Sequence, residues 1–161
     1  KRREINIVSK LVEPHGGNGL KALLAPQTER AGELARARGL IQVPMTSREV
    51  SDLLMLAMGA YTPLDGFMSE TDWRGSCLDM KLANGVFWPI PITLSCERAL
   101  ADRIHAEEEV ALVDGESGEI LAILEVMRYS DGYLFPANGF LYELFVRHER
   151  ASGRFIHLAS F

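Results

Sequence analysis

Cysteine is scarce in this chain, which has only Cys77 and Cys96 among its 161 residues. A domain of this length can bury an adequate hydrophobic core without covalent cross-links. The sequence therefore indicates no disulfide framework, and we expect a reducing, cytoplasmic location. Long hydrophobic runs are also missing, because no stretch is long enough to cross a bilayer and the N-terminus lacks the apolar segment of a signal peptide. We expect no association with a membrane.

Positive charge is in deficit as well, with 17 lysine and arginine residues against 22 acidic ones and a net charge of −5. Proteins that bind nucleic acid gain much of their affinity from cations that neutralise phosphates, so we expect no nucleic-acid partner. A hydrophobic share of 47% with 24% charged residues is ordinary for a globular protein, and the length fits one domain. The chain begins with Lys1 rather than methionine, which indicates a trimmed or partial chain.

The segment GAYTPLDGFM, residues 59–68, combines residues that bend the chain with large apolar ones. Gly59 follows a helical pattern and is suited to ending it in the left-handed conformation. The glycine, proline and aspartate that follow favour tight turns. Three side chains could then anchor the turn to a core: Tyr61, Leu64 and Phe67.

The segment LANGVFWPIPITLS, residues 82–95, alternates apolar positions with a period of two, which predicts a strand over residues 87–94. The apolar positions are Trp88, Ile90, Ile92 and Leu94. Proline has no N–H to donate to a sheet, so Pro89 and Pro91 require either an edge strand or an interrupted one.

Elsewhere the patterns predict short helices and strands. Thr46 and Glu49 form a capping box at the start of a helix whose apolar face comprises Val50, Leu53, Leu54 and Ala57. Further helices are expected over residues 29–38, from 69–72 through Trp73, and over 97–104. Strands are expected over residues 40–43, 109–113 and 120–126, the last two joined by a turn over 114–119. Residues 5–8 are a short strand or an irregular lead-in. This mixture predicts an α+β domain.

Together with LVEPHGG at residues 11–17, these segments resemble the N-terminal domain of the ATP sulfurylase (sulfate adenylyltransferase) family, over about residues 11–129. The resemblance implies a PUA-like pseudo β-barrel of short strands decorated by several short helices, occupying residues 1–131. Residues 132–161 depart from the family and form a divergent segment that packs on this domain or extends it. Within that segment we expect a short amphipathic helix over residues 140–145 and a strand over 154–158.

The family's catalytic motifs are missing from this chain. In the family, a Gln-x-Arg-Asn-Pro motif, an adjacent histidine pair and a Gly-Arg-Asp motif belong to a second domain and hold the nucleotide and the anion. None of them occurs here, so we assign no catalytic, cofactor-binding or metal-binding residue, and no cofactor. The candidate interface or structural residues are His15, Tyr61, Pro63, Leu64, Asp65, Phe67 and Trp88.

Two of these residues, and one glycine-rich loop, have alternative interpretations. His15 is more typical of a structural histidine that bonds to backbone than of a catalytic one. Asp65 is a better turn former than general base, and the glycines of residues 16–19 form a turn rather than a phosphate loop, since the flanking motif residues are missing. We interpret the chain as a noncatalytic scaffold whose partner is a catalytic domain or a second copy. The alternatives are a stand-alone PUA-like module that binds RNA and, less consistent with the missing motifs, a degenerate enzyme.

Overall fold

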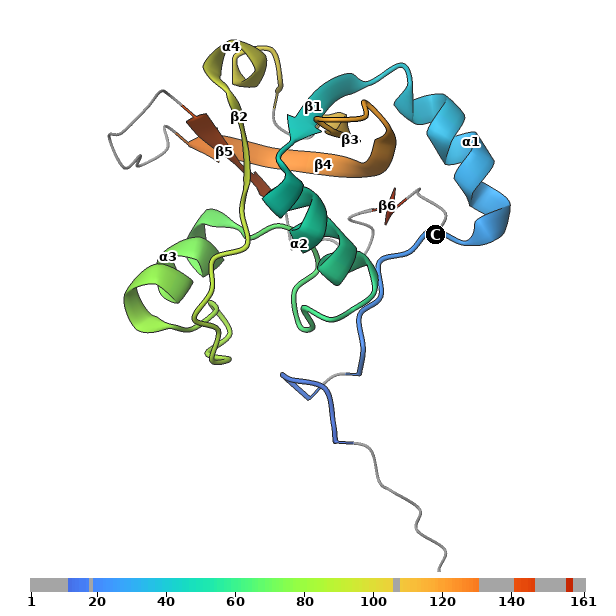
Figure 1. Cartoon of the computed structure of the whole chain (residues 1–161). Coiled ribbons are helices and arrows are strands. Elements are labelled where there is room, and N and C mark those ends of the chain that lie inside the picture. The colour runs from blue at the N-terminus through green and yellow to red at the C-terminus, as the bar shows by residue number, and fades with distance from the viewer. Residues whose placement is uncertain (1–11, 18, 106–107, 131–140, 147–155, 158–161) are drawn as a thin grey trace, which may run out of the picture.

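The computed structural model describes residues 12–17, 19–105, 108–130, 141–146 and 156–157. Short helices and strands alternate along the chain, as expected for an α+β domain (Figure 1). The elements in chain order are α1 (Gln27–Ala37), β1 (Ile41–Met45), α2 (Ser47–Ala57), α3 (Glu70–Asp79), β2 (Leu94–Glu97), α4 (Arg98–Ala101), β3 (Glu109–Asp114), β4 (Ile120–Ser130), β5 (Leu141–Val146) and β6 (Ile156–His157).

The strands form one mixed sheet in the order β1-β3-β4-β5-β2, with β6 added to β4. β1 and β3 are parallel, and the other pairs are antiparallel. The long strand β4 joins the two halves, because its first part pairs with β3 and its last part with β5. Among the described strands β1 and β2 end the order, so the sheet is not a closed barrel. The predicted α+β class is confirmed.

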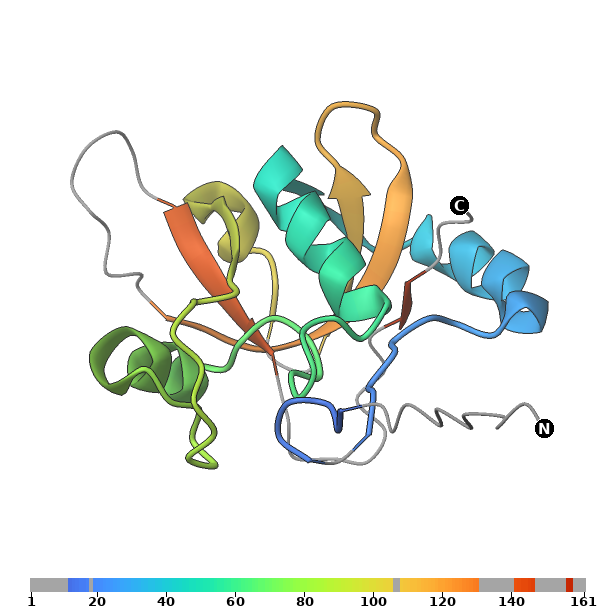
Figure 2. The same ribbon diagram turned by 60° about the horizontal axis from the view of Figure 1, so that its bottom comes forward.

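Helix α2 lies over the middle of the molecule, between α1 at one end and α3 at the other (Figures 1 and 2). The predicted capping box is confirmed, and the helix ends before Gly59, whose φ is +80°. Leu53 and Ala57 are buried as predicted. Leu54 is only half-buried, while Leu56, one turn after Asp52, takes its place in the core.

Two hydrophobic clusters hold these layers together. The larger lies between α2 and the sheet and includes Leu53, Phe67, Met68 and Leu112. The smaller packs Ala37 of α1 against strands β3 and β4. Because all of these side chains are almost fully buried, and burying a large apolar side chain contributes roughly 1.5–3 kcal/mol, the two clusters provide most of the driving force for folding.

The strand predicted over residues 87–94 was wrong for most of its length. Strand β2 begins only at Leu94, and the preceding residues form a single bridge between Phe87 and Lys81. Pro89 and Pro91 offer no N–H to a neighbouring strand, which explains why regular pairing starts after them. The interruption allowed for by these prolines is what the structure contains.

The C-terminal segment differs from the expectation too. The helix predicted over residues 140–145 was wrong, because Leu141–Val146 is the strand β5, paired with β4 on one side and β2 on the other. The strand expected over residues 154–158 is confirmed in the two residues of β6. The prediction for residues 5–8 lies outside the described residues. Of the helices in the described part of the chain, none has the length and apolar character to span a membrane.

Candidate functional site

Three loops from distant parts of the sequence are in contact with one another, namely residues 12–17, 61–68 and 82–92. The first loop bends through Gly16 and Gly17, which both have positive φ. A Cβ added to Gly16 would lie 3.1 Å from ring carbons of Pro63, a distance that leaves little room for a side chain. A glycine there therefore allows the 12–17 loop to lie directly against the turn that contains Pro63.

Trp88 is the centre of this junction. The Nε2 atom of His15 donates a hydrogen bond of 2.7 Å to the carbonyl of Phe87, and the His15 and Trp88 ring centroids are 6.1 Å apart. On another side, Tyr61 meets Trp88 edge to face at 5.8 Å, the geometry that aromatic pairs prefer. The indole N–H of Trp88 donates to the carbonyl of Ile90 at 2.7 Å. The residues expected to be structural at His15, Tyr61 and Trp88 are thus in contact.

Tyr61 also connects the junction to α2. Its hydroxyl donates a hydrogen bond of 3.1 Å to Asp52, and Asp52 forms a 2.9 Å ion pair with Arg48 one turn earlier. Burial, followed by the hydrogen bond to Asp52, raises the pKa of Tyr61 above its ordinary value of 10.0. At neutral pH the phenol is therefore protonated and acts as a hydrogen-bond donor that fixes the loop, which is a positioning role.

The remaining predicted residues lie elsewhere. The side chains of Leu64 and Phe67 belong to the core, with exposed fractions of 3% and 0%. Asp65 forms an ion pair with Lys21, with 2.7 Å between Nζ and Oδ1. The Lys21 partner was missed by the sequence reasoning, because the two residues are 44 positions apart and no local pattern indicates such a contact.

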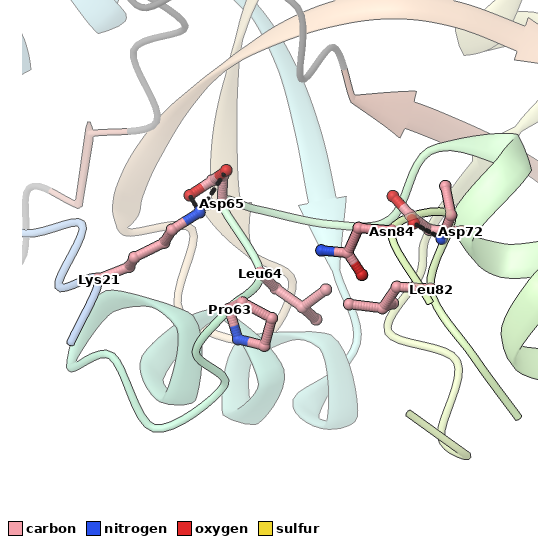
Figure 3. Close-up of a pocket in the computed structure, with 8 residues that line it drawn as sticks. Lys21, Pro63, Leu64, Asp65, Asp72, Leu82 and Asn84 are labelled. Atoms are coloured by element: carbon pink, nitrogen blue, oxygen red, sulfur yellow. Dashed lines mark hydrogen bonds and ion pairs between the residues drawn. The ribbon is translucent and has the colours of Figure 1, made fainter. Parts of the chain in front are cut away.

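A pocket of about 220 Å³ lies beside the junction (Figure 3). Lys21 and Asp65 stand on one side, Pro63 and Leu64 lie between, and Asp72, Leu82 and Asn84 stand on the other. The Asp72 carboxylate accepts a hydrogen bond of 2.8 Å from the backbone N–H of Ala83. With one lysine and two aspartates the lining carries a formal excess of negative charge, which disfavours a polyphosphate ligand.

Metal binding finds no support in the described ranges, where no three histidine, cysteine or carboxylate side chains gather around a common point. The two cysteines are free thiols. Burial, with smaller contributions from Glu49 and Glu97, raises the pKa of Cys96 to about 11. Such a thiol stays protonated at neutral pH and is a poor nucleophile.

Comparison with known families identifies the architecture. A family model for PUA-like domains matches residues 12–135. The chain belongs to the PUA-like domain family. The three loops of the junction and the pocket all fall within the matched residues, so they are parts of this PUA-like domain.

Curated proteins similar to this PUA-like domain include several named sulfate adenylyltransferase. The chain is 56% identical over 120 residues to the sulfate adenylyltransferase of Syntrophobacter fumaroxidans and 50% identical over 119 residues to that of Thiobacillus denitrificans. Both matches cover 74% of this chain and 29% of the relative, so the chain spans less than a third of the length of these proteins. A solved structure described as a hexameric APS kinase from Thiobacillus denitrificans is similar with a TM-score of 0.72 and 34% identity, covering 92% of this chain and 27% of that one.

Proposed function

We propose that this chain serves as the noncatalytic N-terminal scaffold of a sulfate adenylyltransferase, the enzyme that converts ATP and sulfate into adenylyl sulfate and pyrophosphate. The observation that carries the proposal is the 56% identity to a protein of that name over only 29% of its length. In such a protein the matched domain is attached to a larger remainder, which it can support by direct contact. In this proposal its role is to support the catalytic domain in the cytoplasm.

The charges of the described residues support the noncatalytic part of the proposal. Adenylyl transfer requires cations and backbone donors placed around the phosphates. The pocket instead carries excess negative charge, and many basic side chains are already paired with carboxylates, namely Lys21, Arg36, Arg48, Arg74 and Arg98. The same pairs reduce the positive potential that RNA binding needs, so they weigh against the stand-alone RNA-binding alternative.

The domain boundaries follow as part of the proposal. Residues 1–131 form the PUA-like domain, and residues 132–161 extend it. Strand β5 supports the second part of this proposal, that residues 132–161 extend the domain, because it lies between β4 and β2 in the sheet. A sheet strand with partners on both sides is part of the domain that it joins.

Two experiments test the proposed function. First, the purified chain is assayed for pyrophosphate release with ATP and sulfate, and its ATP affinity is measured by calorimetry; we expect no turnover and no measurable affinity. Second, residues 12–131 replace the matching region of the Syntrophobacter fumaroxidans enzyme, and we expect this chimera to release pyrophosphate. Micromolar affinity of the isolated chain for ATP, or a folded chimera without activity, contradicts the proposal.

A further inference from the structure

A hydrogen-bonded hairpin, residues 80–90, projects from the end of α3 beside the pocket; we call it the arm (Figures 1 and 2). Its backbone is fixed by bonds from Trp88 to Met80 at 2.8 Å and from Leu82 to Val86 at 2.9 Å. His15 adds the bond to Phe87 from a different loop. These contacts connect the two sides of the arm to each other and connect the arm to the 12–17 loop.

Four large apolar side chains on the arm and on the last turn of α3 are nevertheless exposed. The exposed fractions are 76% for Leu78, 54% for Met80, 56% for Phe87 and 60% for Ile90. All four lie within residues 78–90, and a concentration of exposed apolar groups in one segment is typical of an interface. Because the arm is already ordered, a partner that covers it loses little additional conformational freedom.

Met80 supplies a second, independent observation. It follows the last residue of α3 with a φ of +54°, the left-handed conformation that glycine or asparagine usually adopts at this position. Local backbone preference therefore opposes a methionine here. A departure from a local rule of this kind is expected where a side chain is needed for contact with something else.

We propose that the arm patch, formed by Leu78, Met80, Phe87 and Ile90, is the surface on which the catalytic part of a sulfate adenylyltransferase docks. The inference rests on the proposed function and names the surface that performs it. In this arrangement His15 and Tyr61 are positioning residues, because they hold Trp88 and the backbone of the arm and leave the apolar side chains to the partner.

The size of the arm patch distinguishes a covalently linked partner from a second copy of the chain. Four side chains of this size, exposed by about half to three-quarters, present roughly 500 Å². A stable complex between separate molecules buries about 800 Å² on each partner. A linked domain needs less area, because linkage alone provides an effective concentration in the millimolar range. In the two relatives more than two thirds of the polypeptide lies outside the matched region, and this remainder supplies such a linked partner.

The test uses the full-length chimera described above and two matched double variants. Phe87→Ser with Ile90→Ser removes half of the arm patch. Leu20→Ser with Met58→Ser removes two comparably exposed side chains, 70% and 56% exposed, that are not part of the arm. We expect the arm variant to reduce pyrophosphate release by the chimera about tenfold or more and to lower its thermal midpoint, while the control variant changes neither.

Measurements on the isolated chain separate the alternatives. The thermal midpoint of the isolated chain is measured with each pair of substitutions. If neither pair changes it, the arm variant is correctly folded. If the unsubstituted chimera is active and the arm variant behaves like the control, the docking surface is wrong and the proposed function stands. If the unsubstituted chimera is folded and inactive, the proposed function fails first. Sedimentation of the isolated chain as a dimer that the arm variant dissociates would assign the arm patch to a second copy and overturn the inference.

Discussion

Glu49 is the residue whose replacement tests the energetics of the fold most directly. Its carboxylate is buried, with 1% exposed, and each of its oxygens accepts two hydrogen bonds. Oε2 accepts from the backbone N–H and hydroxyl of Thr46 at 2.8 and 2.7 Å. Oε1 accepts from the backbone N–H and hydroxyl of Ser95 at 2.7 and 2.6 Å. One side chain therefore completes the cap of α2 and connects that helix to strand β2.

The loss of stability caused by Glu49→Ala depends on the hydrogen-bond donors that lose their acceptor. Thr46 is exposed, so the loss of its two bonds to Oε2 is comparable to the loss of a helix cap, about 1 kcal/mol. Ser95 is half-buried, and an unsatisfied buried N–H costs about 1–3 kcal/mol. We expect a total loss of about 2–4 kcal/mol in the free energy of unfolding, a large part of the ~5–15 kcal/mol typical of a domain. Glu49→Gln keeps one acceptor oxygen and should cost about half as much.

Urea denaturation followed by tryptophan fluorescence measures these values. With a slope of about 2 kcal/mol per molar urea, Glu49→Ala should lower the midpoint by roughly 1–2 M. Glu29→Ala is the matched control: Glu29 occupies the same third position of α1, where the N-cap residue makes no side-chain cap bond. It should change the free energy of unfolding by less than about 0.5 kcal/mol. Equal midpoints for the Glu49 and Glu29 variants would refute the reasoning.

Three further predictions use the same urea assay. In α3 a Cβ on Gly75 would collide with the backbone carbonyl of Lys81, so Gly75→Ala should lower the free energy of unfolding by about 1–3 kcal/mol. Gly32→Ala in α1 is the control, because its Cβ meets open space and should raise the free energy of unfolding by up to about 1 kcal/mol. An unchanged free energy of unfolding for Gly75→Ala contradicts this prediction. The buried thioether of Met68 accepts a hydrogen bond from the backbone N–H of Ile92 at 3.4 Å. Met68→Leu should therefore lower the free energy of unfolding by about 1–3 kcal/mol despite its similar volume. A change near zero would show that the sulfur contact contributes nothing. Because the pKa of Cys96 rises from 9.0 to about 11 on folding, the unfolded chain loses this proton first, and the free energy of unfolding should fall as the pH rises from about 9 towards 11. Cys96→Ala should reduce this dependence of stability on pH. Equal pH dependence in the two proteins would contradict the prediction.

Features that depend on neighbouring residues could be predicted from the sequence. The capping box of Thr46 and Glu49, the left-handed Gly59 and the β3–β4 hairpin were all found where local patterns place them. In each case the signal and the structure lie within a few residues of one another, so the physics that forms the element is contained in the pattern.

Features that depend on distant partners could not be predicted in this way. A short apolar segment at residues 141–146 fits a helix or a strand, and its two neighbouring strands decide the outcome. The capping role of Glu49 was visible, but its second pair of bonds, to Ser95, crosses 46 positions. The contacts of His15 with Phe87 and Trp88 span more than 70 positions. The sequence therefore singled out several residues of the junction without indicating what they touch.

The arrangement of the junction explains why its residue types occur together. The backbone of the arm needs support from a neighbouring loop, since in the described part of the chain its strand pairing is limited to the single bridge between Lys81 and Phe87. The aromatic and histidine contacts at Trp88 provide that support, and the close approach at Gly16 lets the supporting loop reach it. The hydrogen bonds and aromatic contacts at this junction thus stabilise a shape that presents apolar side chains to solvent, as the proposed docking of another surface requires.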